Sequence, residues 1–195
     1  MKPFTKNHIL LILGMILLLQ SVSCKKGEND PFLSCRSRKT RVVGEWLLSS
    51  GTITTHSGTQ IDSTLYNGST YIEYLNGNII QGVYTHRILF ERKGSFTEEI
   101  LSDNVLEKID GYWMFGARNK DAGMKSKETI IVFIQSDALI ANGITTITTY
   151  SGTNYRSYAM KLDELKNEEM TLIYDGSTNN QNSSDLKGSL SFKKK

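Results

Sequence analysis

The chain after residue 41 alternates apolar and polar side chains with a period of two, and this pattern limits its fold more than any other feature. The last segment shows the pattern most clearly, with apolar or small residues (Leu186, Gly188, Leu190, Phe192) between polar ones (Lys187, Ser189, Ser191, Lys193). A period of two is the side-chain repeat of a β-strand that has one face on a core and the other in water. We therefore expect antiparallel strands here.

Six earlier segments share this alternation. Their predicted core faces are Val42, Trp46 and Leu48; Ile88 and Phe90; Phe96 and Ile100; Gly111, Trp113 and Phe115; Tyr158, Met160 and Leu162; and Met170, Leu172 and Tyr174. Turn signals separate the segments at Asn67-Gly68, Asn76-Gly77, Lys93-Gly94, Asn142-Gly143 and Asp175-Gly176. Both prolines precede residue 42, so no later residue lacks a backbone N–H for pairing. Short alternating segments between turns predict an all-β sandwich or barrel.

Three segments complicate this interpretation. Thr97–Asp110 and Ala159–Met170 contain good helix formers, but each also alternates and each is short, so we predict strands. Thr129–Ile134 is apolar on both faces. Such a strand is either covered on both sides or forms a surface that meets a partner.

The N-terminus indicates export from the cytoplasm. Lys2 and Lys6 precede an apolar run of 11 residues, Ile9–Leu19, which is followed by small residues. A membrane-spanning helix needs about 17–25 apolar residues, so this run is too short to span. A positive start, a short apolar stretch and small residues together predict a secretory signal peptide over residues 1–23.

The sequence Ser21-Val22-Ser23-Cys24 resembles the lipobox of bacterial lipoproteins, although Ser21 stands where that motif usually has Leu. The resemblance implies that Cys24 carries lipid and becomes the mature N-terminus; the alternative is an ordinary signal peptide followed by a chance Cys. The following residues resemble the start of Bacteroidetes lipoproteins, which implies an outer-membrane location in the cell envelope. Glu28 and Asp30 loosely match the acidic signal for surface exposure, and the face of the membrane stays open.

Residues 24–41 are polar and predict a flexible, extended tether between the membrane and a domain at 42–195. Its basic cluster, Arg36, Arg38, Lys39 and Arg41, either touches anionic head groups or is simply solvated. Lipidation of Cys24 would leave Cys35 without a partner, as a reactive thiol, an intermolecular bridge or, as we expect, an unreactive residue.

Composition excludes several classes of protein. Removal of residues 1–23 takes away Lys2 and Lys6, and the formal net charge of +3 then falls to about +1. That charge does not indicate a nucleic-acid partner. Two cysteines cannot form a disulfide-rich scaffold or a four-thiolate zinc site.

Two short motifs resemble those of lipocalins. Gly44-Glu45-Trp46 is similar to the G-x-W signature, and Thr153–Tyr158 is similar to the T-D-Y-x-x-Y motif, with Asn154 in place of Asp. The resemblance implies an eight-stranded antiparallel up-and-down β-barrel in which Trp46 is a structural plug. The chain departs from the family at the last strand, which ends in Lys193–Lys195 where lipocalins place an Arg over the Trp.

Residues that carry catalytic chemistry are sparse. His56 and His86 fit no metal or catalytic spacing, and we expect no metal, cofactor or enzymatic activity. A hydrolase built from scattered Ser, His and acidic residues is the least supported alternative. Glu98 shares the face of Phe96 and Ile100. It lies either in a cavity, where burial would raise its pKa, or in water near the end of a barrel, which we expect.

The resulting functional hypothesis is a lipid-anchored, non-catalytic envelope protein that binds a small apolar or amphipathic molecule inside a barrel. Trp113, Phe115 and Glu98 are the candidate ligand contacts. The alternative is a surface interaction or inhibitor module with a filled barrel, suggested by Thr129–Ile134 and the loop Ala117–Lys127. An open or a filled interior would distinguish the two.

Overall fold

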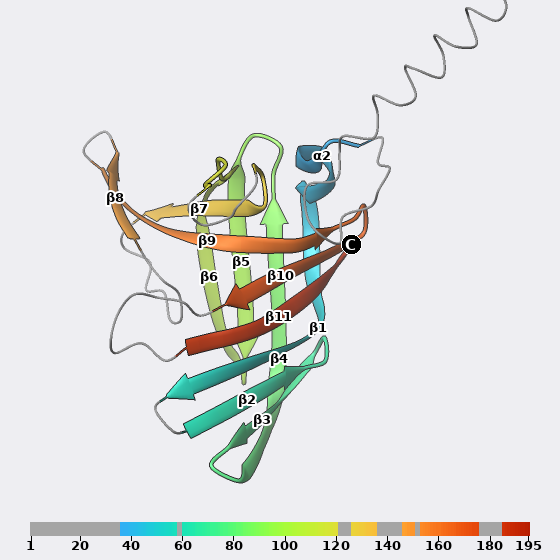
Figure 1. Ribbon diagram of the computed structural model, residues 1–195. Helices are drawn as coiled ribbons and strands as arrows, with labels where there is room; N and C mark the ends of the chain where they lie inside the picture. The colour runs from blue at the N-terminus through green and yellow to red at the C-terminus, as the bar shows by residue number, and fades with distance from the viewer. Residues whose placement is uncertain (1–35, 58–59, 121–125, 136–145, 151–152, 176–184) are drawn as a thin grey trace, which may run out of the picture.

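The computed structural model describes residues 36–57, 60–120, 126–135, 146–150, 153–175 and 185–195 (Figure 1). The expected signal peptide, Cys24 and Cys35 lie outside these residues. A short helix, α2 (Arg38–Val42), precedes the strands. The strands are β1 (Gly44–Ser57), β2 (Gln60–Tyr66), β3 (Thr70–Leu75), β4 (Asn78–Phe90), β5 (Ser95–Ser102), β6 (Val105–Phe115), β7 (Thr129–Gln135), β8 (Thr146–Tyr150), β9 (Thr153–Leu165), β10 (Glu169–Asp175) and β11 (Asp185–Lys194).

The strands form one antiparallel sheet that closes on itself. Strands β1, β4, β5, β6, β7, β9, β10 and β11 pair in that order, and β11 pairs back to β1. Closure of a sheet removes its free edges and separates an inner from an outer face. The prediction of an all-β antiparallel fold is confirmed. The two contested segments, Thr97–Asp110 and Ala159–Met170, lie in strands and a hairpin, as expected.

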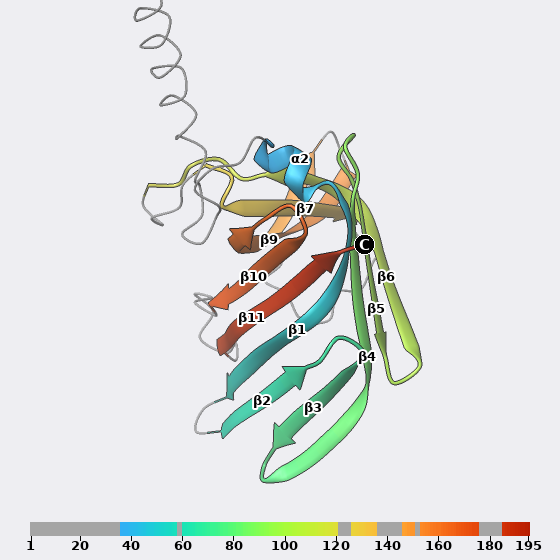
Figure 2. The same cartoon turned by 90° about the vertical axis from the view of Figure 1, so that its right-hand side faces the viewer.

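The two ends of the ring differ in width. At the end near α2, which we call the floor, Gly44–Leu47 of β1 pair directly with β4. Farther along, Gly51–Ser57 of β1 pair with β2, so the β2–β3 hairpin is inserted between β1 and β4. Figures 1 and 2 show β2 and β3 at the opposite end from α2. Each inserted strand adds about 4.8 Å to the wall, so this open end is wider than the floor.

Two of the tight turns have left-handed backbone at both central residues. Asn76 (φ 51°) and Gly77 (φ 77°) join β3 to β4, as the sequence predicted. Asp103 (φ 47°) and Asn104 (φ 71°) join β5 to β6 and were missed. Asp and Asn tolerate this conformation better than most residues, and two such residues in a row favour a two-residue hairpin.

The core fills the floor half of the ring. Apolar side chains from β1, β4, β5, β6, β7, β9, β10 and β11 point inward, and the predicted core faces are confirmed for most of the strands. The buried members are Val42, Trp46, Leu48, Ile53, Ile88, Phe90, Phe96, Ile109, Trp113, Ile130, Val132, Ile134, Met160, Leu162, Leu165, Met170, Leu172, Leu190 and Phe192. Val42 is the exception to the predicted strand pattern, because it is buried as the last residue of α2.

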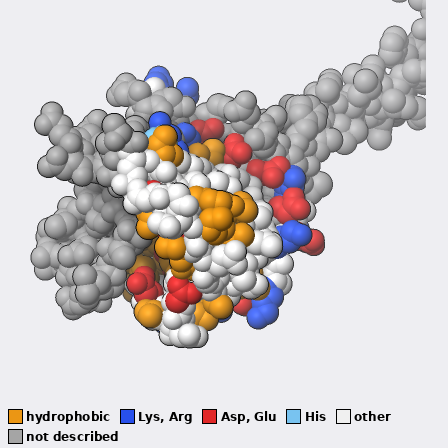
Figure 3. All heavy atoms as spheres, turned by 90° about the horizontal axis from the view of Figure 1, so that it is seen from below, with side chains coloured by type: hydrophobic (Ala, Val, Ile, Leu, Met, Phe, Trp, Pro, Cys, Tyr) orange, Lys and Arg blue, Asp and Glu red, His pale blue; other side chains and the backbone are white. Residues whose placement is uncertain are grey.

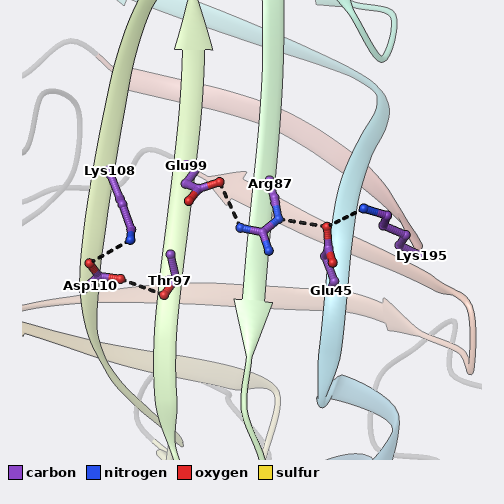
Figure 4. Close-up of polar contacts among 7 residues, drawn as sticks. All are labelled: Glu45, Arg87, Thr97, Glu99, Lys108, Asp110 and Lys195. Atoms are coloured by element: carbon purple, nitrogen blue, oxygen red, sulfur yellow. Dashed lines mark hydrogen bonds and ion pairs between the residues drawn. The ribbon is translucent and has the colours of Figure 1, made fainter.

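The outer face carries ion pairs between neighbouring strands (Figure 4). Arg87 of β4 donates from Nε to Glu45 Oε1 of β1 at 2.8 Å and from Nη1 to Glu99 Oε2 of β5 at 2.9 Å. Charges in water beside an apolar inner face explain the alternation seen in the sequence. On β7, the outward Ile131 and Phe133 are only half-buried, beside exposed side chains of β6.

The structure corrects the expectation for residues 38–41, which were assigned to an extended tether. They form most of α2, where the Ser37 hydroxyl accepts a hydrogen bond from the Thr40 N–H as the N-cap. Arg38 Nη1 donates to the Lys127 carbonyl at 2.8 Å, and Arg41 Nη1 donates to the Leu165 carbonyl. Both arginines are buried and hydrogen-bonded at the floor, so neither is a solvated charge or a head-group contact. A single helical turn is too short to leave a periodic signal in the sequence.

We predict that Gly188→Val strongly destabilises the ring. Gly188 has φ 148°, and a Cβ there would lie 2.0 Å from the Thr52 carbonyl oxygen of the neighbouring strand. Backbone strain and overpacking each cost about 1–3 kcal/mol, so we expect a loss of about 3 kcal/mol in the free energy of unfolding. Urea denaturation followed by tryptophan fluorescence measures it. Ser189→Val on the adjacent residue is the control, and equal stability of the two variants would contradict the described register.

Candidate functional site

The floor is built around Trp46, which is fully buried. Its Nε1 donates to the Val42 carbonyl of α2 at 2.7 Å. Lys194 Nζ lies 4.8 Å from the centre of the Trp46 ring and donates to the Arg41 carbonyl at 2.6 Å. Burial, followed by the charge of Arg36, lowers the pKa of Lys194 despite the opposing charge of Glu168. These contacts tie α2, β1 and β11 together at the narrow end.

Burial decreases along the inner face from the floor to the open end. On β4, Phe90 and Ile88 are 0% exposed and His86 is 4% exposed. Tyr84 is then half-buried, and Ile80 is 40% exposed. The floor half is therefore filled by side chains, whereas the inner wall at the open end is accessible from solvent.

A buried polar cluster lies between these two halves. Glu98 of β5 is 7% exposed and sits on the inner face between Phe96 and Ile100. His86 Nε2 lies 2.6 Å from Glu98 Oε1, and the Tyr158 hydroxyl donates to Glu98 Oε2 at 2.5 Å. The expectation that Glu98 lies in water is wrong. Its position on the inner face of β5 buries the side chain, which meets His86 and Tyr158 inside the ring.

The partners of Glu98 also reverse the expected direction of its pKa shift. Burial is the largest single influence and raises the pKa of Glu98, but the hydrogen bond and charge of His86 and the hydrogen bond from Tyr158 lower it further than burial raises it. The net pKa is lowered. Burial, followed by the charge and hydrogen bond of Glu98, raises the pKa of Tyr158 well above its usual value. The cluster therefore holds an ionised carboxylate at neutral pH.

A cluster of three tyrosines lines the inner wall toward the open end. The ring centre of Tyr84 lies 4.6 Å from that of Tyr66 on β2 and 6.5 Å from that of Tyr71 on β3. The Tyr71 hydroxyl donates to Asp103 Oδ2 at 2.8 Å, and Asp103 Oδ1 accepts the Val83 N–H at 3.1 Å. A Cβ on Gly82 would lie 2.2 Å from the Asp103 carboxylate and 2.4 Å from the Tyr71 ring. Glycine at 82 thus lets these groups lie against the strand.

Sequence reasoning missed this tyrosine cluster, because it assigned no strand to residues 60–80. The alternation of Tyr71–Leu75 and the two-residue spacing of Tyr84 and His86 indicate strands with an inner face. Nothing in the neighbouring sequence indicates that β2 and β3 are inserted between β1 and β4. The cluster depends on pairing between Tyr66 and Tyr71 across two strands.

The other predicted ligand contacts lie elsewhere. Trp113 is 6% exposed, and its Nε1 donates to the Glu91 carbonyl at 2.9 Å in the turn near the floor. Its ring packs 5.6 Å from Phe115 and 5.3 Å from Phe90. Glu98 pairs with Ile109 on β6, four residues from Trp113 and farther from the floor. The structure therefore brings Trp113 together with Phe115 but not with Glu98.

Other features of the described residues are few. A hollow of about 330 Å³ lies beside α2, lined by Ser37, Lys39, Thr40, Val43 and Arg92. No three His, Cys, Asp or Glu side chains in the described ranges converge on a position suited to a metal ion. Within the same ranges, no helix has the length and hydropathy needed to cross a membrane.

Comparison with known proteins identifies no relative. No family model, no curated protein and no solved structure matches the chain.

We predict that Glu98→Gln lowers the free energy of unfolding at pH 7 by about 2 kcal/mol, since hydrogen bonds to a buried carboxylate contribute about 1.5–3 kcal/mol. The folded pKa of Glu98 is lowered, so its contribution is complete above the unfolded carboxyl value of about 4.3 and is lost as the pH falls below that value. Urea titrations between pH 7 and pH 3 measure this.

The control is Glu99→Gln on the outer face of the same strand. We expect the difference between wild type and Glu98→Gln to shrink in acid. A difference that grows as the pH falls would contradict the ionised cluster.

Proposed function

We propose that this protein is a lipid-anchored, non-catalytic, lipocalin-like β-barrel of the bacterial outer membrane that binds a small apolar or amphipathic molecule at its open end. The observation that carries the proposal is the change in burial along the inner face, from 0% exposed at Phe90 to 40% exposed at Ile80. A ring filled at one end and accessible at the other offers a ligand a concave wall and a closed bottom.

The lipocalin-like assignment rests on the arrangement at the floor. Eight strands pair in chain order around the ring, with β2–β3 and β8 as additions. Trp46 opens the first strand beneath a short helix, as the G-x-W resemblance implies for a plug. Lys194 lies over the Trp46 ring, the place that lipocalins give to an Arg. A cation over an indole face is favourable for either residue.

The anchoring half of the proposal rests on Cys24 and the polar residues that follow it. Because α2 begins at Arg38, the tether in this proposal is residues 24–37. Each buried lipid methylene contributes about 0.8 kcal/mol, so two or more acyl chains hold a protein on a bilayer stably.

We expect Cys24→Ser to release the protein from the membrane fraction of its host, because the substitution removes the acylated sulfur. Fractionation measures the release, and mass spectrometry of the wild-type protein should find diacylglycerol on Cys24. Cys35→Ser is the control and should stay in the membrane fraction. An unmodified Cys24 thiol in the wild-type protein would contradict the anchor.

We expect the full chain carrying Cys24→Ser to bind at least one member of a panel of fluorescent fatty acids, retinoids and alkyl amphiphiles saturably, with a Kd in the micromolar range or below. A ligand that buries its apolar part in the open end gains about 25 cal/mol per Å² of apolar surface. Fluorescence titration measures the affinity, and Ile80→Glu on the accessible inner wall should weaken it. No saturable binding across the panel would contradict the carrier function.

One observation favours the alternative, a surface interaction module. The outer face carries exposed apolar side chains, among them Tyr112 (60%) and Met114 (52%) beside β7, and Ile61 (62%) and Ile79 (62%) on β2 and β4. Figure 3, seen from the end at which β2 and β3 lie, shows hydrophobic side chains gathered into a patch on that end of the molecule. Absence of ligand binding together with association through the outer-face side chains named above would favour the alternative.

A further inference from the structure

Acidic side chains occupy the inner wall of the open end. Glu73 of β3 pairs across the sheet with Thr64 and Ile80, and Glu107 of β6 pairs with the inward Ile100. Both therefore share the inner face with Glu98. Burial, followed by the neighbouring Tyr66 and Tyr174, raises the pKa of Tyr84, and the charges of Glu98 and Glu107 add smaller increases. Burial and then the charge of Glu73 raise the pKa of Tyr66. Three carboxylates, Glu73, Glu98 and Glu107, thus share this part of the inner wall, and Arg156 of β9 is a basic residue that the strand register places on the same face, opposite the inward Ile134.

The tyrosine cluster stands beside these carboxylates. Tyr66, Tyr71 and Tyr84 come from three neighbouring strands, and the ring centres of Tyr66 and Tyr71 lie 4.6 Å and 6.5 Å from that of Tyr84. Aromatic faces attract cations, and several rings around one point form the cage by which proteins bind ammonium groups. The hairpin inserted into the ring supplies two of the three rings and also Glu73.

His86 provides an independent indication of a bound polar group. Its Nε2 is engaged by Glu98, but its Nδ1 is buried and has no hydrogen-bond partner among the described residues. An unsatisfied buried polar atom costs about 1–3 kcal/mol, so such atoms are usually paired. Without a ligand, the charge and hydrogen bond of His86 lower the pKa of Glu98. Beside a bound ammonium, the imidazole is in its neutral form, having released its proton to solvent; Nε2 then donates to Glu98, and Nδ1 is an acceptor for a ligand N–H.

We propose that the open end binds an amphipathic amine, with a primary or secondary ammonium between the tyrosine cluster and His86 and an apolar body along the wall at Ile80. This inference rests on the proposed ligand-binding function and specifies the chemistry of the ligand. The carboxylates of Glu73, Glu98 and Glu107 stabilise the positive charge, and a ligand carboxylate in the same place is repelled by them.

The test compares three probes of equal chain length, octylamine, octanoate and octanol, with the full chain carrying Cys24→Ser at pH 8. Isothermal titration calorimetry measures each affinity. We expect octylamine to bind at least 10-fold more tightly than octanol, and octanoate to bind most weakly. Arg156 pairs with the inward Ile134, and its positive charge would favour a carboxylate ligand. The octanoate measurement therefore tests whether Arg156 or the carboxylates dominate at this site.

Variants locate the effect. Glu107→Gln at the exposed rim should weaken octylamine about 3-fold, and Tyr66→Leu should weaken it about 10-fold, with octanol changed less than 2-fold in both. Asp110→Asn on the outer face of β6 is the matched control and should leave all three affinities unchanged. Glu98→Gln, where it folds, should weaken octylamine by about 10-fold.

Outcomes separate the two proposals. Equal binding of octanol and octylamine, or tighter binding of octanoate, overturns the amine site and leaves the proposed carrier function standing. Binding of none of the three probes overturns the amine site, and if the wider panel also fails to bind, the carrier function falls with it. If Asp110→Asn loses octylamine binding, the ammonium binds at the outer face of β6, and this result also overturns the amine site.

Discussion

The closed circuit of backbone hydrogen bonds determines the rest of this structure. Because β9 pairs with β10 and β11 pairs back to β1, the sheet has two faces of different character. The inner face takes the apolar residues, and the outer face takes ion pairs such as Arg87 with Glu45 and Glu99. Surface ion pairs contribute little to stability, so the ring depends mainly on its buried side chains.

Insertion of β2–β3 into the ring gives the two ends different roles. The floor is narrow, filled and capped by α2, with Trp46 fixed by Val42 and Lys194. The open end gains two strands of wall, and these strands bring tyrosines and carboxylates to the inner face. The same insertion thus widens the ring and supplies the groups that we propose bind a ligand.

The Glu98 cluster marks the boundary between the two halves. A carboxylate among Phe96, Ile100 and Ile109 is costly unless it is paired, and His86 and Tyr158 supply that pairing. Buried polar atoms are rarely left without a hydrogen-bond partner, so the unpartnered Nδ1 of His86 requires an explanation. For this reason we place the proposed ligand site here and not at Trp113, which is packed and hydrogen-bonded at the floor.

Much of the fold could be predicted from the sequence, because alternation reports directly which side chain faces the core. The strands with clear alternation, such as Leu186–Phe192, were predicted with the correct inner face. The β2–β3 insertion was not, since its pairing with β1 and β4 depends on long-range register. Glu98 was misjudged for the same reason: its partners His86 and Tyr158 lie 12 and 60 residues away. The helix at 38–42 is too short to leave a pattern.

The most direct test of the account is solution NMR of the chain with labelled tyrosine and histidine, in which octylamine is added stepwise. The account predicts that resonances of Tyr66, Tyr84 and His86 shift on binding while that of Tyr112, on the outer face, stays unchanged. Shifts confined to Tyr112 would place the interaction on the outer wall and contradict the account.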